Sequence, residues 1–147
     1  MMLVGVTSNV TLVDVDVRSI AGLMHLAFRL AHEVSEAALD LEKGGLRGPR
    51  FYASIVADTG VSALAHVAAA SATYSDDYRG RLEAAASLRS ARECLVKLKD
   101  VVSRAAAQHY LDESIAKPLT ARVEETIAVL MALGIEVRGA SPLRLAS

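Results

Sequence analysis

The segment Ser75–Gln108 reads SDDYRGRLEAAASLRSARECLVKLKDVVSRAAAQ and determines the fold that we expect for this chain. Its apolar residues recur at alternating steps of three and four, which places them along one side of a helix. These stripe residues are Leu88, Ala91, Leu95, Leu98, Val102 and Ala105. Ser75 can accept a backbone N–H in the first turn, and Asp76 and Asp77 follow where the helix dipole favours negative charge. The spacing predicts a central helix that packs at a shallow angle against other helices.

The composition favours one helical domain with apolar surface to spare. A chain of 147 residues has the size of a single domain. Hydrophobic residues make up 52% of it and aromatic residues only 4%, so Ala, Val and Leu build the core and allow helices to lie close together. The usual use of surplus apolar surface is a subunit interface.

Charge, cysteine content and hydropathy bear on the compartment and the partners. Lys and Arg total 16 against 17 acids, so no global field draws the chain to nucleic acid or anionic lipid. The single cysteine, Cys94, cannot form an internal disulfide, and beside a helix stripe it is typical of a small buried hydrophobe. The first thirteen residues lack a basic start, and no run reaches about 18 uninterrupted apolar residues. We expect a cytoplasmic protein without a signal peptide or a membrane span.

Residues 1–18 form a separate N-terminal arm in this interpretation. Val13, Val15 and Val17 alternate with Asp14 and Asp16, a pattern typical of a short strand. A lone strand is not stable. The arm therefore pairs with a copy of itself, lies on the helices or stays disordered, and the sequence leaves these three outcomes open.

Two helices are expected before the central one. The first begins at a Ser19 cap and ends near Lys43, where Gly44 and Gly45 supply a stop. Its periodic residues are Ile20, Leu23, Met24, Ala27, Leu30, Ala31, Val34, Ala38 and Leu41. The second helix runs from about Arg50 to Thr73, with Gly60 as a weak point or bend. Its large apolar residues include Phe51, Ile55, Leu64 and Val67.

The last helix is expected from about Asp112 to Leu133, with Pro118 near its start and Gly134 at its end. Its expected inner residues are Ile115, Leu119, Val123, Ile127, Leu130 and Met131. Residues 135–147 are expected to form a short irregular tail, in which Ile135 and Val137 could add a little strand. The sequence therefore predicts an all-α fold, an antiparallel up-down-up-down four-helix bundle over residues 19–134, with a short strand-like N-terminal segment.

The order of these parts resembles the four-helix-bundle proteins encoded in intervening sequences of 23S ribosomal RNA genes. That family includes the accessory variability determinant proteins of diversity-generating retroelements. Its third helix carries a pattern of Leu, Ser, Glu and Leu, and Leu88, Ser90, Glu93 and Leu98 stand at the same spacing. The resemblance implies a ring-shaped homo-oligomer, a pentamer in the accessory proteins, that binds RNA or a protein partner such as a reverse transcriptase. The accessory proteins are typically basic, whereas this chain has a net charge of −1.

The residue patterns of common enzymes and metal sites are missing from the sequence. A di-iron bundle needs Glu-x-x-His pairs, and no histidine here has an acid three residues before it. His32 and Glu36 share one helix face, but two ligands make a weak metal site, so a solvated pair is the favoured interpretation. Cys94 lies in mid-helix among Leu95 and Leu98, so a packing role is favoured over that of a nucleophile. We expect no enzyme, no cofactor, no metal and no small-molecule substrate.

Basic residues are the remaining candidate constellation. Arg81, Arg92 and Lys99 fall in one narrow sector of the central helix, because separations of eleven and eighteen residues are close to whole turns. The full candidate nucleic-acid-binding set is Arg47, Arg50, Arg79, Arg81, Arg89, Arg92 and Lys99. Such a row would contact phosphates without base specificity. Glu93 and Asp100 interleave with it, so a solvated, ion-paired face is the alternative.

Two hypotheses of function follow from these observations. The first is a non-catalytic helical scaffold that assembles into a ring and binds RNA or a protein partner. The second is a structural or protein-interaction bundle without a nucleic-acid role, motivated by the near-neutral charge.

Overall fold

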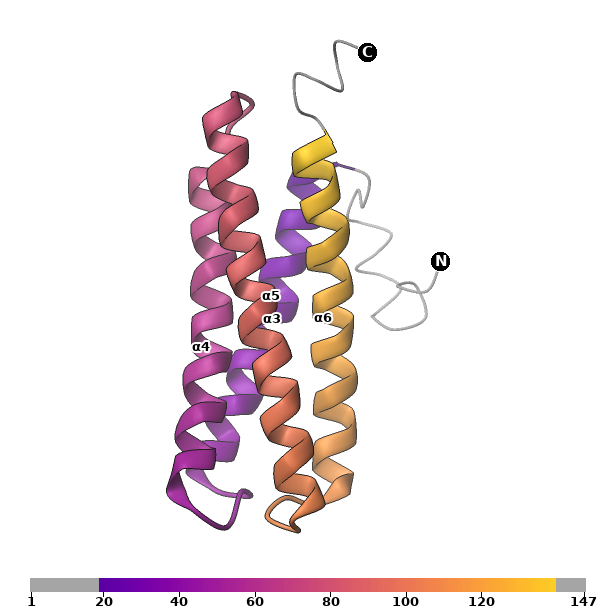
Figure 1. Cartoon of the computed structure of the whole chain (residues 1–147). Helices are drawn as coiled ribbons and strands as arrows, with labels where there is room; N and C mark the ends of the chain where they lie inside the picture. Colours follow the sequence, from indigo (N-terminus) through magenta and orange to yellow (C-terminus); the bar gives the residue numbers. More distant parts are fainter. Residues whose placement is uncertain (1–18, 140–147) are drawn as a thin grey trace.

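The computed structural model describes residues 19–139, which fold into four long helices (Figure 1). They are α3 (Ile20–Lys43), α4 (Arg50–Thr73), α5 (Tyr78–Ala107) and α6 (Glu113–Gly139). No strand occurs within these residues, and the predicted all-α class is confirmed. The strand-like arm predicted at residues 1–18 and the end of the tail, residues 140–147, lie outside the described residues.

The helices stand side by side, and each contacts two neighbours along its length (Figure 1). Helices α3 and α5 both pack against α4 and against α6. The backbone N–H of Arg47, in the α3–α4 connection, donates a 2.7 Å hydrogen bond to the carbonyl oxygen of Tyr110 in the α5–α6 connection. These two connections therefore share one end of the molecule, which lies at the bottom of Figure 1.

The core is built along the stripe that the sequence predicted on α5. All six stripe residues are buried, and Leu95 and Leu98 are 0% exposed. The residues predicted to face inward on α3 are likewise buried, apart from Ile20, which is partly buried at the start of the helix. Heptad-like spacing on α3 and α5 thus identified the buried faces correctly.

The helix caps agree with the sequence at α3 and differ at α5. Ser19 Oγ accepts a hydrogen bond from the Gly22 N–H at 2.9 Å, as predicted. At α5 the prediction of Ser75 as the cap was wrong, because Asp77 Oδ1 accepts the Gly80 N–H at 2.7 Å and the helix begins at Tyr78. Ser75 Oγ instead donates to the Asp77 carboxylate. The Gly80 hydrogen bond is also the largest cause that lowers the pKa of Asp77.

Helix α4 has the predicted bounds. Of the four apolar residues noted on it, Val67 is fully buried, Ile55 and Leu64 are partly buried against the core, and Phe51 is 56% exposed. The buried face also includes Tyr52, Val56 and Ala63. The residues of α4 are small or apolar on every face of the helix, so their pattern does not show which face is buried.

Helix α6 continues beyond the predicted stop. Gly134 is buried inside the helix, which ends at Gly139, and Val137 is fully buried. The predictions of a helix end at Gly134 and of a little strand at Ile135 and Val137 were wrong. Two residues expected on the inner face are exposed, Ile115 by 38% and Met131 by 49%.

Candidate interaction surface

The seven predicted basic residues lie at both ends of the bundle and between them. Arg47 and Arg50 belong to the end where the guanidinium of Arg47 donates to the His109 carbonyl at 3.3 Å. Arg79 and Arg81 lie in the first turns of α5, which follow the far end of α4. The 24 residues of α4 span roughly 36 Å, so these two pairs lie at opposite ends of the bundle and do not form one patch.

Several of the basic side chains are ion-paired. Three predicted residues of α5 are ion-paired, Arg79 with Glu83 at 3.2 Å, Arg81 with Asp76 at 3.5 Å and Lys99 with Glu124 at 2.8 Å. Arg47 lies 3.8 Å from the Asp112 carboxylate. Within residues 19–139, no carboxylate oxygen comes within 4.0 Å of Arg50, Arg89 or Arg92. Of the predicted row on α5, only Arg89 and Arg92 keep guanidinium groups without an acidic partner in the described residues.

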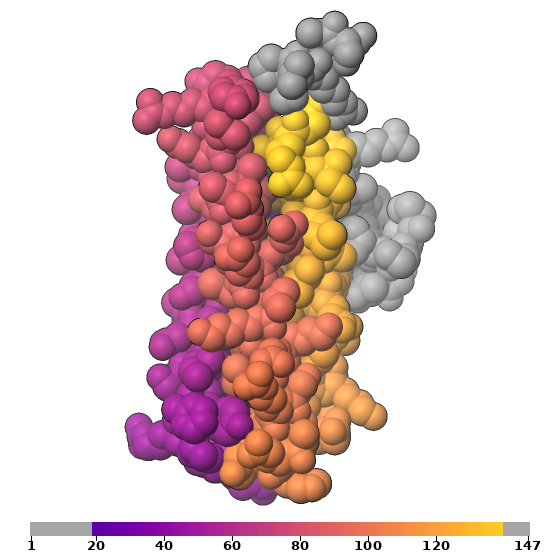
Figure 2. Space-filling view, viewed as in Figure 1, coloured from indigo at the N-terminus to yellow at the C-terminus, as the bar shows by residue number. Residues whose placement is uncertain are grey.

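A second feature of α5 and α6 is an exposed apolar surface, which we name the α5–α6 face. Its large apolar residues, each between 49% and 61% exposed, are Tyr78, Leu82, Val96, Met131 and Ile135. The two helices are direct neighbours, and they run side by side along the front of the molecule in Figure 2. None of these five residues was predicted to belong to an exposed patch.

Helical spacing brings these residues to one side of the molecule. Tyr78, Leu82 and Val96 share a sector of α5, since separations of fourteen and eighteen residues are close to whole turns. The ion pair between Lys99 and Glu124 shows which side of α6 meets α5. Met131 and Ile135 lie seven and eleven residues beyond Glu124, and therefore on the same side. Arg89, seven residues from both Leu82 and Val96, lies among them.

A charged cluster between α3 and α6 was not predicted from the sequence. Glu125 is only 6% exposed, and its Oε1 lies 3.7 Å from Nε of Arg122, whose Nη1 also bonds Glu33 on α3. Glu125 Oε2 is buried and accepts no hydrogen bond from the described residues. Burial raises the pKa of Glu125, Arg122 opposes that rise, Glu33 adds to it, and Arg29 opposes it. Charged residues at three- and four-residue spacing occur on any helix, so spacing alone could not reveal that these side chains face another helix.

The candidate metal pair, His32 and Glu36, and the single thiol, Cys94, have the following surroundings. His32 Nδ1 lies 3.8 Å from Glu36, and both side chains are at least half exposed. Residues 19–139 contain no group of three or more His, Cys, Asp or Glu side chains that could hold a metal ion. Burial, followed by the Glu93 charge, raises the pKa of the Cys94 thiol, which disfavours the reactive thiolate.

Helix α4 alone among the described helices is long and apolar enough to cross a membrane by length and composition. One such helix is weak evidence for a membrane span, because a core helix of a soluble protein meets the same criterion, and α4 packs along both α3 and α5.

Comparison with known proteins gives no family for this chain. A scan against protein-family models, a search of the curated proteins and a search of the solved structures each found no match. The resemblance to the ribosomal intervening-sequence proteins stays a prediction.

Proposed function

We propose that this chain is a non-catalytic scaffold, an antiparallel up-down-up-down bundle that assembles with copies of itself through the α5–α6 face. The observation that carries this proposal is the row of five large apolar side chains exposed along two adjacent helices. Water-exposed apolar side chains are ordinary when scattered singly, but several on one face are typical of an interaction site.

The chemistry of the face suits a second copy of the chain. Tyr, Met and Arg are the residue types enriched at the centres of protein interfaces, and Tyr78, Met131 and Arg89 supply one of each. An interface of this kind closes into a symmetric ring when the rotation between subunits divides the circle evenly. In this proposal the ring forms in the cytoplasm and presents its outer surface to a macromolecular partner.

A matched pair of valine substitutions tests the assembly surface. Val96 on the α5–α6 face is 55% exposed and Val61 on α4 is 42% exposed, so glutamate fits either position without entering the core. We expect Val96→Glu to lower the mass in solution to the 15.5 kDa of one chain, and Val61→Glu to keep the wild-type mass. Light scattering with in-line chromatography measures both. Equal masses for the two variants would contradict assembly through this face.

Binding of RNA through Arg89 and Arg92 is the second candidate function, and it is an alternative to assembly through the α5–α6 face because Arg89 lies among the residues of that face. Neither guanidinium has a carboxylate within 4.0 Å in the described residues, so both can contact phosphate without breaking an ion pair. Such binding weakens as salt rises, because phosphate contacts release counterions.

The test compares two arginine substitutions on a structured RNA at about 50 mM and about 200 mM salt. We expect a joint Arg89→Ala and Arg92→Ala change to reduce affinity and flatten the salt dependence. Arg79→Ala, which removes an exposed and ion-paired arginine of the same helix, serves as the control. Undetectable binding at low salt, or equal losses in both proteins, would leave the scaffold without the nucleic-acid role. A reverse transcriptase is then the partner to test first.

A further inference from the structure

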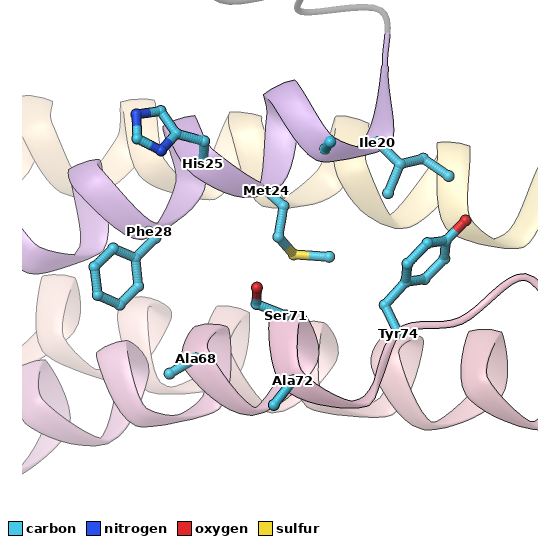
Figure 3. A pocket seen from close by; sticks show the side chains of 9 residues that line it. Ile20, Met24, His25, Phe28, Ala68, Ser71, Ala72 and Tyr74 are labelled. Carbon is cyan, nitrogen blue, oxygen red and sulfur yellow. The ribbon is translucent and has the colours of Figure 1, made fainter.

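The helix pair α3 and α4 carries an open groove that the assembly proposal does not use. Its volume is about 600 Å³, and nine residues line it. In Figure 3 the rings of Phe28 and Tyr74 stand toward its two ends, with Met24 and Ser71 between them and Ala68 on the α4 side. Phe28 is 42% exposed, so a large part of an aromatic ring faces water here. We name this feature the α3–α4 groove.

We propose that the chain's own N-terminal arm, through Val13, Val15 and Val17, occupies the α3–α4 groove. The arm joins the helices next to the groove. The described residues start at Ser19, and the next residue, Ile20, already lines the groove. Ser19 has an extended backbone, with φ −86° and ψ 151°, so the chain leaves the helical path at the mouth of the groove.

The arm is long enough to cover the groove. From Ile20 to Phe28 the groove follows eight residues of helix, which span about 12 Å. An extended chain covers about 3.3 Å per residue, so the five residues from Ile20 back to Val15 span about 17 Å. Because Ser19 itself is extended, the proposal places the reversal of the chain just before it, and Val17, Val15 and Val13 then follow α3 from the level of Met24 toward that of Phe28. A longer linker is not required.

The valine side of the arm matches the lining of the groove. Alternation places the three valines on one side of an extended segment and Asp14 and Asp16 on the other. The groove lining includes no Asp, Glu, Lys or Arg, so it suits the valine side. The two carboxylates then face water and stay solvated, which avoids the cost of burying a charge.

A tethered segment also has an advantage over the same segment of a second copy. A short linker holds it at an effective concentration in the millimolar range, far above the concentration of other chains in dilute solution. The groove lies on α3 and α4 rather than on the α5–α6 face, so this proposal does not depend on the assembly proposal.

Disulfide trapping in the full-length chain tests the occupant. The background is Cys94→Ala, which removes the only native thiol. One protein adds Val15→Cys and Ala68→Cys, and its control adds Val15→Cys and Ala128→Cys on α6. Ala68 and Ala128 are both exposed, so neither thiol disturbs the core. We expect the Ala68 pair to form an intramolecular disulfide at least about ten times faster than the Ala128 pair.

Two results would overturn the proposal. Similar rates for the two pairs would mean that the arm does not prefer the groove. A disulfide that forms only between chains, seen as a doubled mass on a denaturing gel, would assign the groove to the arm of a second copy.

A labelling experiment provides a readout that needs no disulfide. In the Cys94→Ala background, a maleimide reacts with Ala68→Cys or with Ala128→Cys alone. Changing Val13, Val15 and Val17 to Ser should speed labelling at position 68 several-fold and leave position 128 unchanged. An unchanged rate at position 68 would show that the valines do not cover the groove.

Discussion

Leu95 is the core position whose replacement has the clearest expected result. Its side chain is 0% exposed at the middle of the α5 stripe, with apolar neighbours from the other helices. In Leu95→Asp a carboxylate would lie there without a partner, and we expect a loss of more than about 4 kcal/mol in the free energy of unfolding. Urea denaturation followed by circular dichroism measures that loss.

The matched control is Arg92→Glu, three residues away on the same helix. Arg92 is only partly buried and has no carboxylate within 4.0 Å in the described residues, so we expect a change within about 0.5 kcal/mol. A Leu95→Asp protein with the wild-type transition would mean that the stripe faces outward.

Because Glu125 is buried, the free energy of unfolding is expected to fall as the pH rises and this carboxyl loses its proton. Burial raises the pKa of Glu125 above its ordinary value of 4.5, against the opposing charge of Arg122. The folded chain therefore holds this proton more tightly than the unfolded chain does. The stability due to the neutral carboxyl is fully present below the unfolded pKa and is lost as pH rises through the folded pKa.

Replacing Glu125 with Met should remove the loss of stability that Glu125 causes as the pH rises. Met has a similar length and no charge, and Arg122 keeps its partner Glu33. At pH 7 we expect Glu125→Met to be more stable than wild type by roughly 1 to 2 kcal/mol, with the gain shrinking toward about pH 4. The control is Glu124→Met, where the side chain is 54% exposed and pairs with Lys99, so the change is small. Thermal melts at both pH values measure the effect, and a loss at pH 7 would contradict it.

At the scale of the helices, replacing either of two glycines with alanine is expected to change stability in opposite directions. Gly134 lies inside α6, and a Cβ there would meet nothing closer than the Arg138 guanidinium at 3.9 Å. Gly60 lies inside α4 against α3, and a Cβ there would come within 2.8 Å of the Ala38 Cβ. One glycine thus only weakens its helix, whereas the other allows two helices to approach.

We expect Gly134→Ala to raise the free energy of unfolding by about 0.5 to 1 kcal/mol, because alanine loses less backbone entropy in a helix. Gly60→Ala should lower it by about 1 to 3 kcal/mol, because the helices must separate or shift. Chemical denaturation of both proteins gives the comparison. A stabilised Gly60→Ala protein would mean that α3 and α4 have room between them at this point.

The helices also show what the sequence could and could not predict. On α3 and α5 large apolar residues alternate with charged ones, so the period identified the buried face and the Ser19 cap identified a start. On α4 nearly every residue is small or apolar, so the sequence did not separate the exposed Phe51 from the buried Tyr52 and Val56. Gly134 was mistaken for a stop, since glycine ends many helices but is also tolerated inside one whose packing is favourable.

The candidate surfaces were harder to predict than the helices, because they depend on neighbours in space. The angular sector of Arg81, Arg92 and Lys99 follows from their spacing on α5, but their ion pairs involve the α4–α5 connection and α6. Met131 was assigned to the core because it follows Leu130, and one residue is enough to turn a side chain about 100° around a helix.

At the scale of the whole molecule, the exposed apolar area predicts assembly. At about 25 cal/mol per Å² of apolar surface, burying 400 Å² per subunit contributes roughly 10 kcal/mol. Association costs at least about 4 kcal/mol in lost translational and rotational freedom, so one contact retains up to about 6 kcal/mol, a dissociation constant of tens of micromolar. Two contacts per subunit in a closed ring therefore favour assembly at micromolar concentration more than a single contact does. The five side chains of the α5–α6 face, each about half exposed or more, provide apolar area of this order.

The number of subunits is the last prediction, and the resemblance to the retroelement accessory proteins makes it five. We expect light scattering with in-line chromatography to give a mass near five times the 15.5 kDa of one chain, unchanged on dilution through the micromolar range. A closed ring keeps its mass on dilution because every subunit has both its interfaces satisfied, whereas an open chain of subunits shortens. A stable mass of twice 15.5 kDa would reject the ring of five and keep the α5–α6 interface as a two-fold contact. A mass of one chain at every concentration would reject assembly altogether, and the apolar face would then belong to a different protein partner.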